Sequence, residues 1–475
     1  MTPAPVMMRL SEAAHAVGAE VRGSDVAFSS VSQDSRSLAS GALFVALRGE
    51  RFDGHQFLAR ARQQGAVAAL VDEAGFRDQD SALNEQWPLV VASDTRKALG
   101  ELAKHWRSKF TIPFIALTGS SGKTTVKEML ALVLREAVNQ LAPESRIPNP
   151  ESCVLATRGN LNNDIGVPLM LLELRPHHRY AVIEMGMNHA GEIAWLTSLA
   201  RPDVALVINA GRAHLEGLGS KEAVARAKGE IFEGLTPDGV AVINADDHFA
   251  ALWRELAAQH RVVTFGVDAP ADITATYALS GVASQIVLTT SLGTAPSALQ
   301  VPGLHNVRNA LAAAAAASAL EIDPQIIAAG LARFAGVKGR LQTKRALHGA
   351  TLIDDTYNAN PDSVCAAISV LAAAPGVRLM VLGDMGELGA TAPELHAEIG
   401  TFARAAGIDQ LLTLGDLSQQ AARTFGKGAR HFPRIEELLA EIENRLAPDV
   451  TMLIKGSRFM RMERVVQSFE VRGEE

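Results

Sequence analysis

Continuous apolar runs alternate with helix-like segments through the middle of the chain. The runs lie within residues 113–119, 180–186, 203–211, 239–247 and 261–266. Runs without polar alternation are typical of strands covered on both faces, as in a parallel sheet. The helical patterns between them supply the crossovers that parallel strands need. The pattern therefore predicts a mostly parallel α/β unit.

Similar patterns flank this unit. Near the N-terminus, strands are expected at 42–47, 66–71 and 87–94, with helices at 57–65 and 97–109. Residues 270–302 differ, because their short runs favour antiparallel strands. After residue 334, apolar runs alternate with helical stretches again, which is typical of a doubly wound fold. Further strands are expected there at 351–358, 378–385, 410–416 and 450–457.

These patterns divide the chain into three expected α/β domains, as a length of 475 residues also suggests. Residues 1–110 form a small N-terminal substrate domain. Residues 111–333 form a central domain with a phosphate-binding loop, a mostly parallel sheet and a short antiparallel addition. Residues 334–475 form a C-terminal Rossmann-like domain.

Composition narrows the class of protein. Hydrophobic residues make up 48% of the chain, charged residues 20%, and the formal net charge is −7. No Lys- or Arg-rich block occurs, which argues against nucleic acid or a membrane surface as the main partner. Cys153 and Cys365 form no metal-binding spacing and are expected to be reduced thiols in a cytoplasmic protein.

No signal peptide or integral membrane segment is expected. The N-terminal residues lack a charged start followed by an apolar stretch. The longest smooth apolar run, 309–320, is too short and too alanine-rich to span a bilayer. Its small side chains favour a tightly packed helix instead.

Residues 118–125, TGSSGKTT, follow an apolar strand and precede a helix, which is the setting of a phosphate-binding loop. The usual pattern places a glycine where Leu117 stands, so an ordinary glycine turn remains the alternative. In a phosphate-binding loop, the N–H groups at the helix start face phosphate oxygens. Lys123 would reach the phosphates, and the Thr124 hydroxyl would bind Mg²⁺.

Further candidates lie near the expected carboxyl edge of the same sheet. Glu184 ends one strand and could bind Mg²⁺, although a single Glu there is more often structural. His214 follows the next strand and is more often a capping or packing residue. Spacing alone favours a solvated surface position for Lys228.

Two polar groups complete the pattern. Asn306 and Asn309 are one turn apart at the start of the alanine-rich helix, where they could also serve as caps. Asp355, Tyr357 and Asn358 follow a strand of the third domain and are expected at the edge of its sheet.

Together these motifs resemble the Mur ligases, the ATP-dependent amide-forming enzymes of peptidoglycan precursor assembly. The family's phosphate loop also lacks the early glycine. YAVIEMG, INAGRAH, ARAK, GLHNVRNALAA, the pair Gly339–Arg340 and DDTYNANP all fall in the family's order. The resemblance covers nearly the whole chain.

Three stretches are most similar to the family members that add D-Ala-D-Ala to a UDP-linked tripeptide. They are residues 33–57, GNLNNDIGVP at 159–168, and the pair DDTYNANP and LGDMGELG. The resemblance implies that ATP phosphorylates the terminal carboxylate of UDP-N-acetylmuramoyl-tripeptide. The amino group of D-Ala-D-Ala then attacks the acyl phosphate.

The resemblance also implies residue roles. Lys123, Glu184, His214 and Lys228 are the implied catalytic residues. Two Mg²⁺ ions would be held by Thr124, Glu184, His214 and Lys228, with the lysine carbamylated. ATP would be bound by Gly119, Ser120, Ser121, Gly122, Lys123, Thr124, Thr125, Asn306, Asn309, Arg340, Asp355 and Asn358. The UDP-linked substrate and the joined groups would be bound by Ser35, Arg36, Asp53, Gly54, His55, Asn162 and Asn163.

Other readings remain open at this point. Another ligase of the superfamily, of the diaminopimelate-adding or folylpolyglutamate type, is the nearest enzyme alternative. A regulatory protein that holds nucleotide without forming a product is the alternative from another class. Residues 141–158 are longer than the family's usual connection and are expected to be a flexible surface insertion, with a position over the substrate cleft as the alternative. A monomer that closes its domains on ligands is expected.

Overall fold

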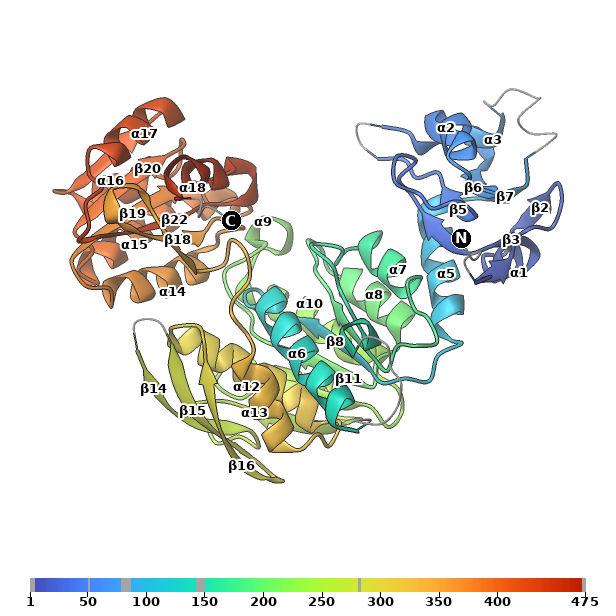
Figure 1. Cartoon of the computed structure of the whole chain (residues 1–475), viewed down its shortest axis with the longest axis horizontal. Coiled ribbons are helices and arrows are strands. Elements are labelled where there is room, and N and C mark those ends of the chain that lie inside the picture. The colour runs from blue at the N-terminus through green and yellow to red at the C-terminus, as the bar shows by residue number, and fades with distance from the viewer. Residues whose placement is uncertain (1–4, 50–51, 78–86, 142–149, 281–282, 472–475) are drawn as a thin grey trace.

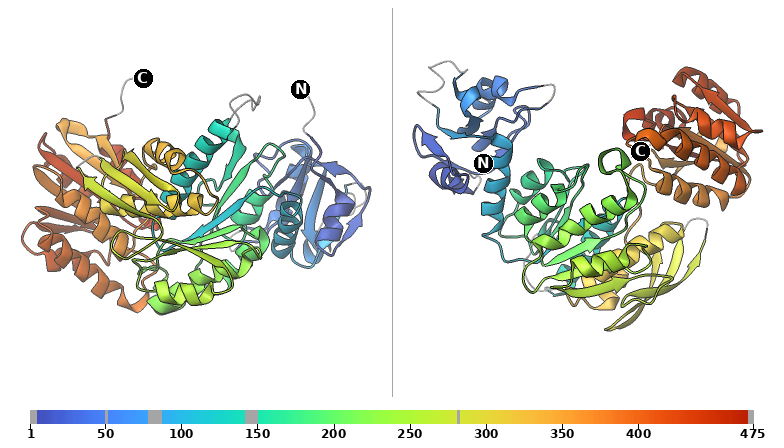
Figure 2. Two further views of the ribbon diagram at one scale, coloured as in Figure 1. Left: turned by 90° about the horizontal axis from the view of Figure 1, so that it is seen from below. Right: turned by 180° about the vertical axis from the view of Figure 1, so that it is seen from behind.

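The computed structural model describes residues 5–49, 52–77, 87–141, 150–280 and 283–471. Within these residues, the chain forms three successive α/β bodies, each built on its own main sheet. The central body lies between the other two (Figures 1 and 2). The three-domain α/β class expected from the sequence is confirmed. Part of the expected insertion at 141–158, namely 142–149, lies outside the described residues.

The N-terminal body has a sheet with the strand order β2-β7-β6-β5-β4, in which only β2 runs antiparallel to its neighbour among the described strands. A small β1-β3 pair lies beside it. The strands are β1 (Met8–Arg9), β2 (Glu20–Arg22), β3 (Ala27–Phe28), β4 (Ser30–Ser32), β5 (Ala42–Val45), β6 (Ala68–Asp72) and β7 (Leu89–Ala92). The helices are α1 (Leu10–Ala16), the 3₁₀ helix η1 (Gly54–Phe57), α2 (Leu58–Gln63), α3 (Glu73–Arg77) and α5 (Thr95–Arg107).

The central sheet is parallel throughout its described strands, in the order β13-β12-β11-β8-β10-β9. Its strands are β8 (Phe114–Thr118), β9 (Val154–Ala156), β10 (Tyr180–Glu184), β11 (Val204–Val207), β12 (Val240–Asn244) and β13 (Arg261–Phe265). The associated helices are α6 (Lys123–Leu141), η2 (Pro150–Cys153), α7 (Gly166–Leu171), α8 (Glu192–Ala200), α9 (Leu215–Leu218), α10 (Lys221–Gly229), η3 (Glu230–Gly234) and α11 (Ala250–Leu256).

Both faces of this sheet are buried, which explains the continuous apolar runs. Along β8, Phe114 and Ala116 join the apolar core that contains α5 and α8. Ile115 and Leu117 point the other way, into the core that contains α6 and α12 (Leu304–Ser318). Successive side chains of a strand alternate between faces, so a strand covered on both sides needs apolar residues at every position.

The antiparallel addition is β14 (Thr274–Leu279), β15 (Ser284–Thr290) and β16 (Gly293–Leu299). It packs against α12 and α13 (Pro324–Ala332), as Figure 1 shows. In α12, the six consecutive alanines from 312 to 317 are all 0% exposed. The expectation of a tightly packed helix is therefore confirmed.

The C-terminal body has the strand order β17-β18-β22-β19-β20-β21, parallel except for β17. Its strands are β17 (Gln342–Arg345), β18 (Thr351–Asp355), β19 (Val377–Gly383), β20 (Gln410–Leu414), β21 (Ala429–Phe432) and β22 (Val450–Lys455). Its helices are η4 (Leu347–Gly349), α14 (Pro361–Ala372), η5 (Gly389–Thr391), α15 (Ala392–Ala405), α16 (Gln419–Phe425), α17 (Ile435–Glu443), η6 (Arg458–Met460) and α18 (Glu463–Phe469).

The packing of α12 predicts that added volume will destabilise the central body. Ala313→Leu should lower stability by about 1–3 kcal/mol, because Ala313 is 0% exposed and a larger side chain there must displace its neighbours. Ala251→Leu, at an exposed position of α11, is the matched control and should change stability little. The midpoint of urea unfolding checks this, and equal midpoints for the two variants would contradict the prediction.

Candidate functional site

A cleft of about 1700 Å³ brings together the carboxyl ends of the central strands and residues of the C-terminal body. Open α/β sheets bind ligands at this edge. Tyr357 lines the cleft, as do fourteen of the residues to which the sequence assigned a binding or catalytic role. The fourteen are Ser120, Ser121, Gly122, Lys123, Thr125, Asn162, Asn163, Glu184, His214, Asn306, Asn309, Arg340, Asp355 and Asn358.

The glycine-rich loop lies at the start of α6 and depends on Gly122. Gly122 has a φ of 82°, and a Cβ built there would lie 2.4 Å from Asn309 Oδ1. Only glycine combines this left-handed backbone with so close a neighbour. Asn309 thus packs against the phosphate loop from α12, while its Nδ2 donates to Asn306 Oδ1 at 3.3 Å.

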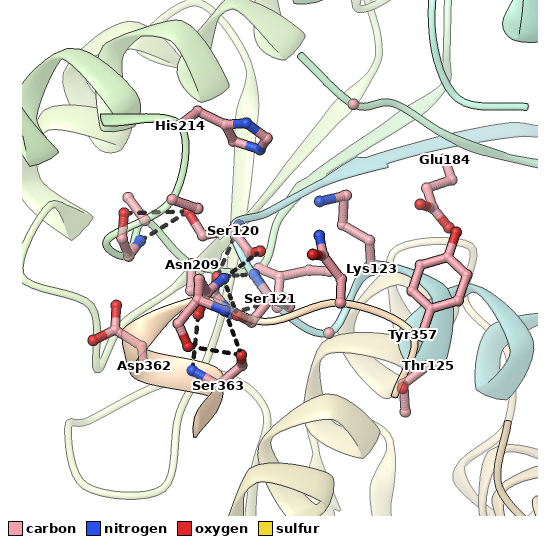
Figure 3. Close-up of a pocket in the computed structure, with 18 of the residues that line it drawn as sticks. Ser120, Ser121, Lys123, Thr125, Glu184, Asn209, His214, Tyr357, Asp362 and Ser363 are labelled. Carbon is pink, nitrogen blue, oxygen red and sulfur yellow. Dashed lines mark hydrogen bonds between the residues drawn. The ribbon is translucent and has the colours of Figure 1, made fainter. Parts of the chain in front are cut away.

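Several hydrogen-bond donors of this loop are paired with acceptors within the protein. Lys123 Nζ donates to the Gly119 carbonyl at 2.7 Å. The N–H groups of Ser120 and Ser121 both donate to Asn209 Oδ1 at 3.0 Å, as Figure 3 shows. Asn209 was missed in the sequence, although it stands in the INAGRAH motif that carries His214. An anion at the loop would find donors already arranged around an oxygen atom.

Glu184 ends β10, is 2% exposed, and is held by two segments of the chain. Thr124 Oγ1 donates to Glu184 Oε2 at 3.0 Å, and Asn162 Nδ2 donates to Glu184 Oε1 at 2.8 Å. Burial lowers the pKa of the nearby Lys123 ammonium, and Glu184 partly offsets that shift. The carboxylate therefore has a defined orientation beside the phosphate loop.

His214 contacts the C-terminal body. Its backbone is left-handed, with a φ of 57°, and its Nδ1 lies 2.8 Å from Glu387 Oε2. This contact lowers the pKa of the Glu387 carboxyl. Glu387 belongs to the LGDMGELG stretch and also lines the cleft. In this structure the His214 side chain therefore links the central body to the C-terminal body through Glu387.

Lys228 does not lie on the surface, so the position favoured by spacing alone is wrong. Its helix, α10, turns it inward, and the residue is 1% exposed. Burial, with the Lys123 charge nearby, lowers the pKa of its ammonium well below the usual value. Among the described residues, the Lys228 side chain has no hydrogen-bond or ion-pair partner. A buried amine of this kind favours its neutral form.

The C-terminal body adds charged groups to the part of the cleft around Thr124 and Glu184. Arg340 Nη2 donates to Thr124 Oγ1 at 3.0 Å, and its guanidinium lies over the Tyr357 ring, 4.3 Å from the ring centre. Asp355 is paired in register with Lys455, whose Nζ donates to Asp355 Oδ2 at 2.5 Å. Burial raises the pKa of the Asp355 carboxyl, against the opposing effect of Lys455.

Contacts missed in the sequence hold this body against the central one. Arg212 donates from its backbone N and its Nε to the Asp362 carboxylate, at 2.7 and 2.9 Å. Its Nη1 donates to both Glu398 oxygens at 2.7 Å. Asn360 Nδ2 donates to Ser121 Oγ at 3.2 Å. Arg212 and Asn360 stand inside motifs that the sequence singled out, but their cross-domain partners have no local signal.

The five residues expected to face UDP lie in the N-terminal body and are not among the cleft-lining residues. Ser35 is 5% exposed, whereas Arg36 is exposed and pairs with Asp34, lowering the pKa of that carboxyl to about 2. His55 is 3% exposed; its Nδ1 lies 2.6 Å from Asp53 Oδ1, and its Nε2 accepts the Asp72 N–H at 3.2 Å. Both ring nitrogens are therefore engaged within the protein.

One residue of the N-terminal body that was not selected from the sequence does reach the cleft. Arg96, in α5, lines it and donates from Nη2 to Asp164 Oδ1 at 2.7 Å. Asp164 follows the two expected asparagines, Asn162 and Asn163, in the same loop. The ion pair thus links the N-terminal body to the asparagine-rich loop.

The described residues offer few ligands for a cation outside the phosphate loop. No three His, Cys, Asp or Glu side chains gather into a metal-binding group in the described parts of the chain. The Thr124 hydroxyl and the Glu184 carboxylate do offer hard oxygen donors beside the phosphate loop, which Mg²⁺ prefers. Among the helices of the described residues, none is both long enough and apolar enough to cross a membrane. Both Cys153 and Cys365 are free thiols.

Three family models match the chain in succession. They are the Mur ligase family catalytic domain at residues 27–107, the Mur ligase middle domain at 117–317, and the Mur ligase glutamate ligase domain at 339–458. The UDP-N-acetylmuramoyl-tripeptide--D-alanyl-D-alanine ligase of Escherichia coli (strain K12) is 42% identical over 472 residues. That match covers 98% of this chain and 99% of the relative.

Solved structures agree with this match. A crystal structure of MurF from Acinetobacter baumannii has a TM-score of 0.88 and 36% identity, and the match covers 98% of this chain and 99% of that one. MurF from Thermotoga maritima in complex with ADP has a TM-score of 0.76 and 25% identity, with 92% and 96% covered. The three family models and the relative at 42% identity agree with the motifs that line the cleft, and the chain belongs to the Mur ligase family.

Proposed function

We propose that this chain is the ATP-dependent ligase that joins D-Ala-D-Ala to UDP-N-acetylmuramoyl-tripeptide. The products are the UDP-linked pentapeptide, ADP and phosphate, in peptidoglycan precursor synthesis. The observation that carries the proposal is the floor of the cleft, where Thr124, Glu184, Asn162 and Arg340 form one hydrogen-bonded group beside the phosphate loop. The relative at 42% identity carries this activity in its name.

The chemistry requires activation of a carboxylate. A carboxylate is a poor electrophile, so transfer of the γ-phosphoryl group of ATP to its oxygen supplies a leaving group. The free amine of D-Ala-D-Ala then attacks the carbonyl carbon, forms the amide and expels phosphate. The protein positions the three substrates and neutralises charge. Lys123 and Arg340 are suited to the transferred phosphoryl group, since both lie beside the loop as cations.

Thr124, Glu184 and His214 would hold Mg²⁺ together with phosphate oxygens. When bound, Mg²⁺ offsets the repulsion between the γ-phosphate and the attacking carboxylate. Two ions are proposed, as the family resemblance implies. Asn162 and Thr124 would keep the Glu184 oxygens oriented for this task.

We further propose that Lys228 becomes a carbamate. Its neutral amine can attack carbon dioxide, forming an N–C bond and releasing one proton. The product is an anion, which suits a buried position near the Lys123 cation better than a second ammonium does. The support is the depth of the residue and its lack of any partner among the described residues.

The remaining residues divide between the substrates. Asn306 and Asn309 would bind the nucleotide from α12, and Arg340, Asp355 and Asn358 would bind it from the C-terminal domain. Asn162 and Asn163 would lie near the joined groups. We propose that the UDP end binds near Ser35, Arg36, Asp53, Gly54 and His55. The proposed domain limits are 1–110, 111–333 and 334–475. The reaction belongs in the cytoplasm, where ATP and nucleotide-linked precursors are made.

The assignment predicts one product. Incubation with ATP, UDP-N-acetylmuramoyl-tripeptide and D-Ala-D-Ala should yield the UDP-linked pentapeptide, identified by mass spectrometry, with phosphate released in equal amount. Phosphate release that requires a single amino acid in place of the dipeptide would favour another ligase of the superfamily. Equal ATP turnover without any acceptor would favour a regulatory nucleotide-binding protein.

The carbamate predicts a rescue experiment. Lys228→Ala should lower kcat about 100-fold, because the loss resembles removal of a group that orients a metal ligand. Short-chain carboxylates should restore part of the activity by occupying the vacated space. Lys221→Ala, at an exposed position of the same helix, is the control and should stay active. An unmodified lysine mass under native conditions, together with no rescue, would contradict the carbamate.

A further inference from the structure

Lys127 is a buried cation that none of the proposed chemistry uses. It lies one turn beyond Lys123 on α6 and is 1% exposed. Its Nζ donates to the Thr157 carbonyl at 2.6 Å and lies 2.7 Å from Glu128 Oε1. The Glu128 carboxylate is partly exposed, so the Thr157 carbonyl is the partner on the interior side.

Thr157 connects this cation to the cleft. It follows β9, is 1% exposed, and its Oγ1 accepts the N–H of Glu184 at 2.9 Å. The chain then continues into the loop that carries Asn162, whose Nδ2 donates to Glu184 Oε1 at 2.8 Å. Thr157 thus supports both the backbone of Glu184 and the segment that orients its carboxylate.

These contacts form a closed ring. Lys127 joins α6 to Thr157, Thr157 joins Glu184, and Glu184 Oε2 accepts from Thr124 Oγ1 at 3.0 Å, back on α6. Thr124 lies three residues before Lys127, on the same side of the helix. Fixing one side of such a ring restricts the distance between the Thr124 hydroxyl and the Glu184 carboxylate on the other.

The choice of lysine supports a positioning role. Taking an ammonium out of water is costly, and a methionine would fill the same space without that cost. A methionine could not donate to the Thr157 carbonyl, whereas lysine supplies a directional, charge-assisted bond. In some proteins a buried ionic group selects one arrangement over its alternatives, and the directional bond from Lys127 to Thr157 fits that role.

We propose that Lys127 is a positioning residue for the metal site, setting the distance between Thr124 and Glu184 through Thr157. This inference rests on the proposed function, because it takes Thr124 and Glu184 as ligands of Mg²⁺. Lys127 itself touches neither substrate nor metal.

The test measures Mn²⁺ as the probe for Mg²⁺, in the presence of ADP, from the electron paramagnetic resonance signal of the free ion. Lys127→Met should weaken Mn²⁺ binding about 10- to 100-fold, the usual effect of losing a group that orients a ligand. The Mg²⁺ concentration for half-maximal activity should rise in parallel. Mn²⁺ affinity equal to that of the unaltered protein would overturn the proposal.

Arg107→Met is the matched control for a purely structural effect. Arg107 also donates to backbone carbonyls, those of Ala200 and Phe110, both at 2.7 Å, but it does not line the cleft. This variant should melt at a lower temperature with unchanged Mn²⁺ affinity. If Lys127→Met does not fold, Lys127→Gln keeps a shorter donor and must still weaken Mn²⁺ binding, or the proposal fails.

Glu184→Gln separates this inference from the function on which it rests. If Glu184→Gln leaves Mn²⁺ binding unchanged, the proposed metal site itself is wrong. If Glu184→Gln weakens binding and Lys127→Met does not, the metal site stands and only the positioning role fails.

Discussion

The Glu184 carboxylate is the point on which the site depends. It ends the strand next to β8, so its backbone position follows from the parallel sheet, and its two oxygens are claimed by different segments. One oxygen is held by the helix that follows the phosphate loop and the other by the asparagine-rich loop. A buried carboxylate needs such partners, since an unpaired one would be strongly disfavoured. Because both partners donate to one carboxylate, Glu184 also fixes the position of the phosphate loop relative to the asparagine-rich loop.

Basic side chains gather around this carboxylate. The Lys123 and Arg340 cations lie near one another, with the Lys228 amine beside Lys123, and burial lowers the pKa of both lysines. Like charges in a confined space repel, so the floor of the cleft is arranged for anions. Nucleotide phosphates and substrate carboxylates meet this requirement, and so does a carbamate on Lys228. The acidic net charge of the whole chain gives no hint of this local balance.

The C-terminal body completes the site from a distance in sequence. Its contacts with the central body are polar and directional, through Arg212, Asn360 and Glu387, and two of these involve the phosphate loop or His214. Polar interfaces of this kind suit a domain that docks and separates, because water can replace their hydrogen bonds. The nucleotide would be bound by groups from both bodies, which links its binding to their docking.

The sequence by itself determined the three-domain α/β class, the main central strands and the phosphate loop. Periodicity and motif order are local properties, and strands buried on both faces leave a clear apolar signal. It did not reveal edge strands such as β9, β17 and β21, because each has only three or four residues and leaves little periodic signal. Nor could it place Lys228 inside, or find Asn209, Arg212 and the ring through Lys127 and Thr157. Those positions depend on how helices turn and pack on the sheet, and on contacts between segments far apart in the chain, for which spacing carries no information.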